Sequence, residues 1–229
     1  MDSAALDALL LVGLTFVAFS SVSNALGGAA GGLLPAGGAR GLQLTKVQVG
    51  LLAVARGLKA QLDEIGAAAD TSDNAGLKEL LQAVSLALLR NPQYWELGAA
   101  ARRGAADAAD LEREFNSASL SERSKFADET LVNVRGGGGV RRRAPAPPGG
   151  GLGHPDELIV VTLLVATKGE LDLPKRVDGA ESLRALLRGL GGLPAEQVLG
   201  VEVLWTPQAE GDYFSRDEVT ADYPDMRVL

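Results

Sequence analysis

The sequence contains no cysteine and only one histidine, His154, among its 229 residues. Without cysteine the chain has no disulfides, no thiolate nucleophiles and none of the common cysteine-based zinc or iron–sulfur sites. A single histidine also excludes sites built from several histidine ligands. His154 stands between Gly153 and Pro155 with no motif partner to orient it, so we predict no catalytic role for it.

Aromatic residues and positive charge are scarce as well. Phe, Trp and Tyr make up 4% of the sequence, and 22 Lys and Arg residues stand against 29 Asp and Glu residues, for a net charge of −7. The sequence pI of about 4.9 disfavours binding to phosphate backbones, so we expect no nucleic-acid partner. The mean hydropathy is nevertheless positive, at +0.10. The apolar excess must therefore be concentrated in particular segments.

The motifs of common catalytic and phosphate-binding sites are missing. No Gly-x-Gly-x-x-Gly joins a strand to a helix, no Gly-x-Ser-x-Gly is present, and no acidic residues have the spacing of a metal-binding loop. The glycine run at 136–139 lacks the Gly-Lys-Ser/Thr ending of a phosphate loop. We therefore predict that the chain is not an enzyme and holds no catalytic, cofactor-binding or metal site.

An apolar N-terminal segment carries no charged residue from position 8 to position 39. About twenty residues at ~1.5 Å each cross a hydrocarbon layer of ~30 Å, so residues 1–26 are predicted to form one transmembrane helix. A secretory signal peptide and a buried core helix remain as alternatives, disfavoured by the acidic flank and by the lack of a polar face. The predicted span residues are Leu9, Leu10, Leu11, Val12, Leu14, Phe16, Val17 and Phe19.

The Gly-rich segment 27–41 is predicted to be a flexible tether between this span and a soluble domain at 42–229. Acidic residues precede the span, whereas Arg40, Lys46 and Arg56 follow it. The positive-inside tendency therefore predicts that the soluble domain lies on the cytoplasmic or stromal side of the membrane.

A second low-complexity segment, residues 135–153, is rich in Gly, Pro and Arg and is predicted to be a mobile loop within the domain. It contains Arg141, Arg142 and Arg143 in succession. Cations near a charged bilayer attract anionic headgroups, so these three residues are candidates for contact with lipid or with a partner.

The soluble domain has the periodicities of an α+β fold. Alternating or continuous apolar runs predict three strands, at 44–51, 158–166 and 198–205, of which the last two are expected to be buried on both faces. Apolar residues at three- and four-residue steps predict helices at 51–65, 77–88, 105–115 and 180–190. A capping box of Ser119 and Glu122 is predicted to open another helix, at 119–134.

The order strand, helix, strand from residue 158 to residue 205 indicates a crossover unit, in which the two strands are parallel neighbours. The strand at 44–51 lies far from this unit in the sequence. We therefore expect a short mixed sheet covered by helices and preceded by the transmembrane helix.

Several motifs that occur in a fixed order are similar to those of a plastid and cyanobacterial family. They lie at 46–56, 86–94, 115–116, 121–126, 129–134, 158–166, 201–208 and 222–224. Their combination resembles the domain-of-unknown-function family fifteen-seventeen, which includes a plant chloroplast protein of fluctuating-light acclimation. The likeness runs from about residue 44 to residue 229.

This resemblance implies a protein of the chloroplast thylakoid or envelope membrane, with its domain in the stroma. It also implies a role in tuning photoprotective quenching and the proton gradient, and it carries over no catalytic residue. The leading hypothesis is a non-enzymatic regulator or accessory subunit whose partners are membrane lipid and a photosynthetic membrane protein complex.

Two alternatives stay open. One is a membrane-tethered domain that binds a small ligand or acts as a metabolic enzyme, with a cleft at the carboxyl ends of the strands at 158–166 and 198–205. The other is a structural linker subunit of a membrane assembly, in which the helix at 8–26 makes most of the contacts.

Overall fold

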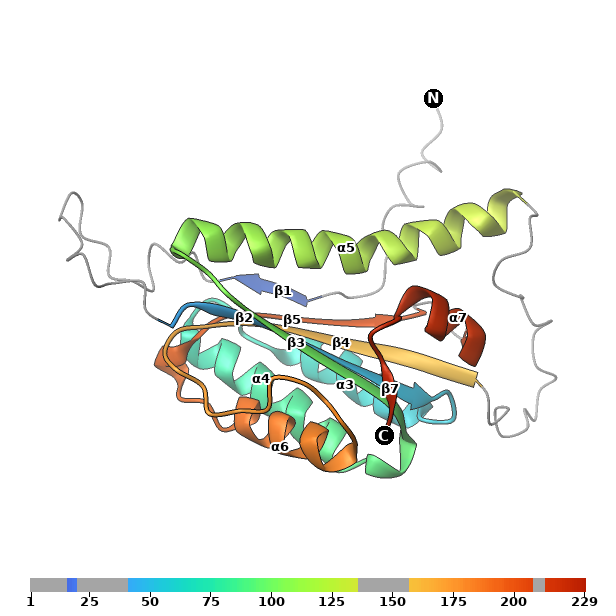
Figure 1. Ribbon diagram of the computed structural model, residues 1–229, viewed down its shortest axis with the longest axis horizontal. Helices are drawn as coiled ribbons and strands as arrows, with labels where there is room; N and C mark the ends of the chain where they lie inside the picture. Colours follow the sequence, from blue (N-terminus) through green and yellow to red (C-terminus); the bar gives the residue numbers. More distant parts are fainter. Residues whose placement is uncertain (1–15, 20–40, 136–156, 208–212) are drawn as a thin grey trace.

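The structure is a computed structural model that describes residues 16–19, 41–135, 157–207 and 213–229. Within these residues seven β-strands form one sheet in the order β1-β5-β4-β2-β3-β7, and β6 pairs with β4 beside this path. All pairings are antiparallel. Helices lie on both faces of the sheet (Figure 1), so the predicted α+β class is confirmed.

The four long strands form the middle of the sheet. They are β2 (Gln43–Leu52), β3 (Trp95–Gly104), β4 (Glu157–Thr167) and β5 (Val198–Thr206). Every residue of β4 and β5 is buried, which confirms the prediction of strands covered on both faces. The short strands are β1 (Phe16–Phe19), β6 (Phe214–Ser215) and β7 (Arg227–Val228).

β4 and β5 are antiparallel neighbours, so the predictions of a parallel crossover and of a mixed sheet are wrong. The connection between them contains α6 (Ala180–Gly191) and a short 3-10 turn, Ala195–Gln197, and returns to the end of the sheet that it left. The N–H of Lys168 donates to the carbonyl of Gln197 at 2.9 Å and closes this connection at its base. The same order of elements serves both topologies, and only the direction of return distinguishes them.

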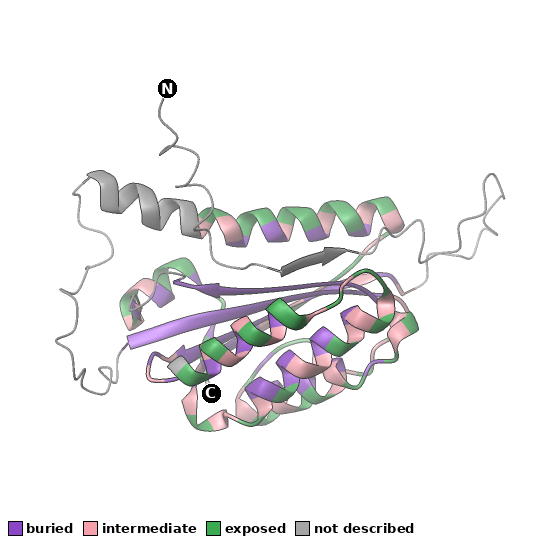
Figure 2. Ribbon diagram, turned by 180° about the vertical axis from the view of Figure 1, so that it is seen from behind, coloured by how far each residue is buried: buried purple, intermediate pink, exposed green. Residues whose placement is uncertain are grey.

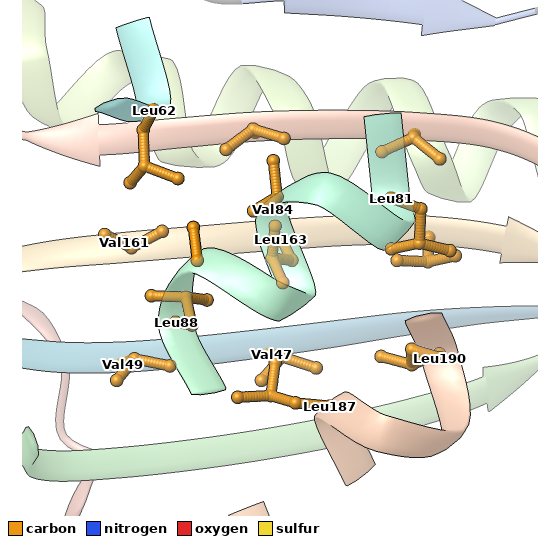
Figure 3. Packing of buried hydrophobic residues seen from close by; sticks show 14 of the residues in the cluster. Val47, Val49, Leu62, Leu81, Val84, Leu88, Val161, Leu163, Leu187 and Leu190 are labelled. Carbon is orange, nitrogen blue, oxygen red and sulfur yellow. The ribbon is translucent and has the colours of Figure 1, made fainter. Parts of the chain in front are cut away.

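Three helices cover one face of the sheet: α3 (Arg56–Ala68), α4 (Asn74–Leu89) and α6. Their apolar stripes pack against side chains of β2, β4 and β5 and form the largest core (Figure 3). α4 carries seven buried residues on this side, including Leu81, Val84 and Leu88. It is capped by Asp73, which accepts a hydrogen bond from the N–H of Gly76 at 2.8 Å. A 3-10 turn, Pro92–Tyr94, then leads into β3.

The opposite face is covered by α5 (Ala108–Arg135) and α7 (Arg216–Asp222) (Figure 1). α5 is one continuous helix, so the prediction of two helices separated by a capping box at Ser119 and Glu122 is wrong. Both side chains lie in the middle of the helix and are buried, at 8% and 3% exposure. A Ser followed three residues later by Glu fits a cap, and it also fits a helix face that contacts a polar partner. Figure 2 shows the exposed outer side of this helix.

No helix among the described residues is long and apolar enough to span a membrane. Phe16–Phe19, which belong to the predicted span, form β1 and pair with β5, so at these four residues the predicted helix is replaced by a strand. Val and Phe favour strands, and pairing covers an edge of β5 that would otherwise be open. The other predicted span residues, Leu9, Leu10, Leu11, Val12 and Leu14, lie outside the described residues, and so do 20–40 and 136–156.

Candidate functional site

The sheet face beneath α5 carries polar side chains inside an otherwise apolar layer. Gln48 of β2 and Thr162 of β4 lie opposite each other in register, and Glu202 lies on β5. These three residues are exposed by 3%, 2% and 0%. Buried polar groups require hydrogen-bond partners. Most of the partners here come from α5.

Two side chains of α5 hold the carboxylate of Glu202. Arg123 donates to Oε1 from Nε at 3.0 Å and from Nη2 at 2.8 Å, and the hydroxyl of Ser119 donates to the same oxygen at 3.1 Å. Ser119 and Arg123 are four residues apart and therefore share one side of the helix. Among the described residues Glu202 Oε2 has no hydrogen-bond partner. The charge of this fully buried carboxylate therefore depends on Arg123 for compensation.

A second carboxylate, Glu122, joins α5 to β2. Its Oε1 accepts hydrogen bonds from Lys46 Nζ at 3.3 Å and from Gln48 Nε2 at 3.2 Å, and its Oε2 accepts one from Lys125 Nζ at 2.8 Å. Lys125 Nζ also lies 3.7 Å from the ring centroid of Tyr223, which is a cation–π contact. We call the polar and charged side chains that connect α5 with the sheet the charge network; they are Lys46, Gln48, Ser119, Glu122, Arg123, Lys125, Thr162 and Glu202. These contacts place Lys46 at its border.

Lys46 and Gln48 also line a cleft of about 610 Å³ along the outer edge of β3. The cleft lies within the volume range of small-molecule and peptide sites. Its walls come from β2, β3, the segment before α6 and the C-terminal segment, and its lining residues are Lys46, Gln48, Ala99, Ala100, Ala101, Arg102, Lys175, Arg176, Val177, Asp178, Asp225 and Arg227.

The cleft is basic although the whole chain is acidic. Two carboxylates face five cations there, so the local balance is positive, against −7 for the sequence. Lys175 and Arg176 are exposed, and no ion pair joins either of them to a carboxylate in the described part of the chain. An anionic group would meet unpaired positive charge in this cleft.

Arg102 ties one wall of the cleft to β3. Its guanidinium donates to the carbonyls of Leu171 at 3.2 Å and of Leu173 and Pro174 at 3.4 Å. Burial lowers the pKa of Arg102 below its ordinary value, and an arginine still remains charged at neutral pH. The fixed positive charge of Arg102 therefore lies against the wall segment that immediately precedes Lys175 and Arg176 in the sequence.

Sequence reasoning identified none of these cleft residues as a site. Arg141, Arg142 and Arg143, the predicted contacts with lipid or a partner, lie outside the described residues, as does His154. Residues 41–135, 157–207 and 213–229 contain no cluster of three or more His, Asp or Glu side chains that could hold a metal ion. The local signals of the cleft are the pairs Arg102-Arg103 and Lys175-Arg176, which are far apart in the sequence.

The predicted cleft between the carboxyl ends of the strands at 158–166 and 198–205 is wrong. β4 and β5 are antiparallel, so their last residues, Thr167 and Thr206, lie at opposite ends of the sheet. Strands must be parallel for their carboxyl ends to meet at one edge.

A family model described as "protein of unknown function (DUF1517)" matches residues 41–229. The chain belongs to the DUF1517 family. This match confirms the family resemblance of the sequence motifs, and it includes every residue of the cleft and of the charge network. Both are therefore features of the DUF1517 portion of the chain.

Two relatives are similar over most of this DUF1517 chain. It is 38% identical over 231 residues to "Protein FLAP1 homolog A" of Synechocystis, which covers 96% of the chain and 68% of that protein. It is 37% identical over 191 residues to "FLUCTUATING-LIGHT-ACCLIMATION protein 1, chloroplastic" of Arabidopsis thaliana, which covers 80% of the chain and 46% of that protein. The chain thus matches less than half the length of the Arabidopsis relative. No solved structure matches the chain significantly.

Proposed function

We propose that this DUF1517 protein acts in light acclimation as a binding protein without chemistry of its own, a regulator or accessory subunit of photosynthetic membrane complexes. The Arabidopsis relative is named for fluctuating-light acclimation, and the Synechocystis relative is named as a homologue of FLAP1. In this proposal the chain tunes photoprotective quenching and the proton gradient when the light changes.

The observation that carries the binding role is the basic cleft. Its cations lie along an open strand edge, and Lys175 and Arg176 face solvent without an ion-pair partner in the described structure. Charge complementarity of this kind attracts an oppositely charged partner and selects against others. The cleft therefore supports recognition of an anionic surface of a partner.

The proposed location is the chloroplast thylakoid or envelope membrane, with the domain on the stromal side. The name of the Arabidopsis relative supports the chloroplast, and the uncharged N-terminal sequence supports membrane attachment. A membrane helix that includes Phe16–Phe19 requires β1 to leave the edge of β5. An anchored form would therefore differ from the described form at that edge.

Light acclimation is tested in a cyanobacterial strain from which its own DUF1517 gene has been deleted. We expect expression of this chain to restore wild-type chlorophyll-fluorescence quenching under alternating low and high light. Under constant light, the difference in quenching between the deletion strain and the complemented strain should be smaller. The protein level is followed by immunoblot in each strain. A chain that accumulates normally and leaves quenching unchanged under alternating light contradicts the proposed function.

A further inference from the structure

Among the residues that the structure describes, the outer edge of β3 is only partly paired. β7 pairs with Leu97 and Gly98, and no other described strand pairs with residues 99–104 on that side. β7 demonstrates that this edge accepts a strand, because the N–H of Leu229 donates to the carbonyl of Glu96 at 3.1 Å. An open edge of this kind is a template for another strand.

The direction of the backbone groups identifies which of them are available. The carbonyl of Glu96 faces β7, whereas the N–H of Ala105 faces the opposite way and donates to the carbonyl of Leu42 at 2.8 Å. Because backbone groups alternate along a strand, the N–H and C=O groups of Ala100 and Arg102 point outward from the sheet. They therefore lie along the cleft in the geometry that an added strand requires.

The side chains around this edge select the charge of the added strand. Ala99, Ala100 and Ala101 are small and leave space beside the backbone. Lys175 and Arg176 directly follow the segment that is hydrogen-bonded to Arg102. Positive charge at an edge keeps neutral and basic strands away and favours an acidic one.

Lys46 lies at the side of the cleft that faces α5, where Glu122 partly compensates its charge. Among the described residues, the unpaired positive charge of the cleft is therefore chiefly that of Lys175 and Arg176. The chain itself offers no matching segment in two of its undescribed parts: the run Arg141–Arg143 has the wrong sign, and residues 8–39 carry no charge. Two acidic residues occur in each of the short stretches 1–7 and 208–212, whereas charge complementarity to Lys175 and Arg176 over a strand of about six residues favours a more acidic segment, from another molecule.

We infer that the open edge of β3 binds an extended acidic segment of a partner protein, about six residues long, as an added antiparallel strand. Backbone hydrogen bonds to Ala100 and Arg102 supply the pairing, and Lys175 and Arg176 supply the selection for acidic side chains. This inference rests on the proposed binding function and names the chemistry of the partner.

The probe is a fluorescein-labelled, amidated hexapeptide, Glu-Val-Asp-Thr-Glu-Val, titrated with the full chain and followed by anisotropy. We expect saturable binding that weakens as salt is raised. The same peptide with alternate backbone nitrogens methylated keeps its charges and loses its donors, so we expect at least tenfold weaker binding. A peptide with Lys in place of Glu and Asp should not bind measurably.

Two variants separate charge from backbone pairing. Lys175→Glu/Arg176→Glu should weaken binding at least tenfold, because it reverses exposed charges at the cleft. Ala100→Pro removes an outward N–H and leaves the cations in place, so the same loss is expected. Circular dichroism and thermal unfolding verify that each variant is folded. The matched control, Arg90→Glu/Arg188→Glu, changes the net charge equally at exposed positions outside the cleft and should bind normally.

Three results would overturn the inference. The first is absence of binding at millimolar peptide to the folded chain. The second is equal affinity for the N-methylated peptide together with unchanged binding by folded Ala100→Pro, which would show that charge alone attracts the peptide. The third is binding to phosphatidylglycerol vesicles or pyrophosphate, but not to the peptide, with sensitivity to Lys175→Glu/Arg176→Glu. If quenching is restored in the deletion strain while the peptide fails, the strand addition is wrong and the proposed function stands.

Discussion

Replacing Arg123 with alanine is expected to lower the free energy of unfolding by about 3 kcal/mol. Glu202 is fully buried, and one of its oxygens accepts both hydrogen bonds of the guanidinium. Removing one partner of a buried ion pair leaves an uncompensated charge in the interior. The expected loss of stability lies at the lower end of the range for broken buried ion pairs, because the Arg123 side chain is 37% exposed, which lets water reach the site. Urea unfolding followed by circular dichroism measures the change.

The matched control for this prediction is Arg113→Ala in the same helix. Arg113 pairs with Asp110 at 2.8 Å, but its side chain is 70% exposed, so the loss should be below about 0.5 kcal/mol. Adding Glu202→Gln to Arg123→Ala removes the buried charge and should recover at least half of the lost stability. If the free energy of unfolding of Arg123→Ala is within about 0.5 kcal/mol of the wild-type value, this ion pair does not hold α5 to the sheet.

Leu81→Ala is expected to cost about 3 to 4 kcal/mol and to lower Tm by roughly 10 °C. Leu81 is fully buried where α4 packs on the sheet, and its truncation leaves a cavity among side chains that are themselves buried (Figure 3). Leu and Ala have similar helix propensities, so the loss reports packing. Differential scanning calorimetry measures the Tm.

Leu86→Ala on the same helix is the control, because Leu86 is 40% exposed. Its cost should stay below about 1 kcal/mol. Equal losses for the two variants would mean that α4 does not pack on the sheet through the side that carries Leu81.

Periodicity in the sequence predicted the elements that are buried in a regular pattern, on both faces of a strand or along one side of a helix. The continuous apolar runs of β4 and β5 and the Leu stripe of α4 are signals of this kind, because they follow from which faces are covered. β3 was missed because Ala100, Ala101, Arg102 and Arg103 show no apolar alternation, and an edge strand does not need any. The antiparallel order of β4 and β5 depends on where α6 returns, which no local pattern encodes.

The cleft and the charge network depend on pairings between distant positions. Lys46 and Glu122 are 76 residues apart in the sequence, and Arg123 and Glu202 are 79 apart. In the sequence Glu122 indicates a capping box with Ser119, and the charges of Glu122 and Arg123 otherwise indicate an exposed helix face, since charged runs usually contact water. The structure turns this side of α5 toward the sheet, where buried polar residues of three strands meet it. The proposed binding surface therefore follows from the register of the sheet and from the position of α5.

The central claim, that the DUF1517 domain acts in light acclimation through its basic cleft, is tested most directly by complementation with Lys175→Glu/Arg176→Glu in the deletion strain. At protein levels equal to wild type, the account predicts that this variant fails to restore quenching under alternating light, whereas Arg90→Glu/Arg188→Glu restores it. Full restoration by Lys175→Glu/Arg176→Glu at equal protein level would contradict the claim.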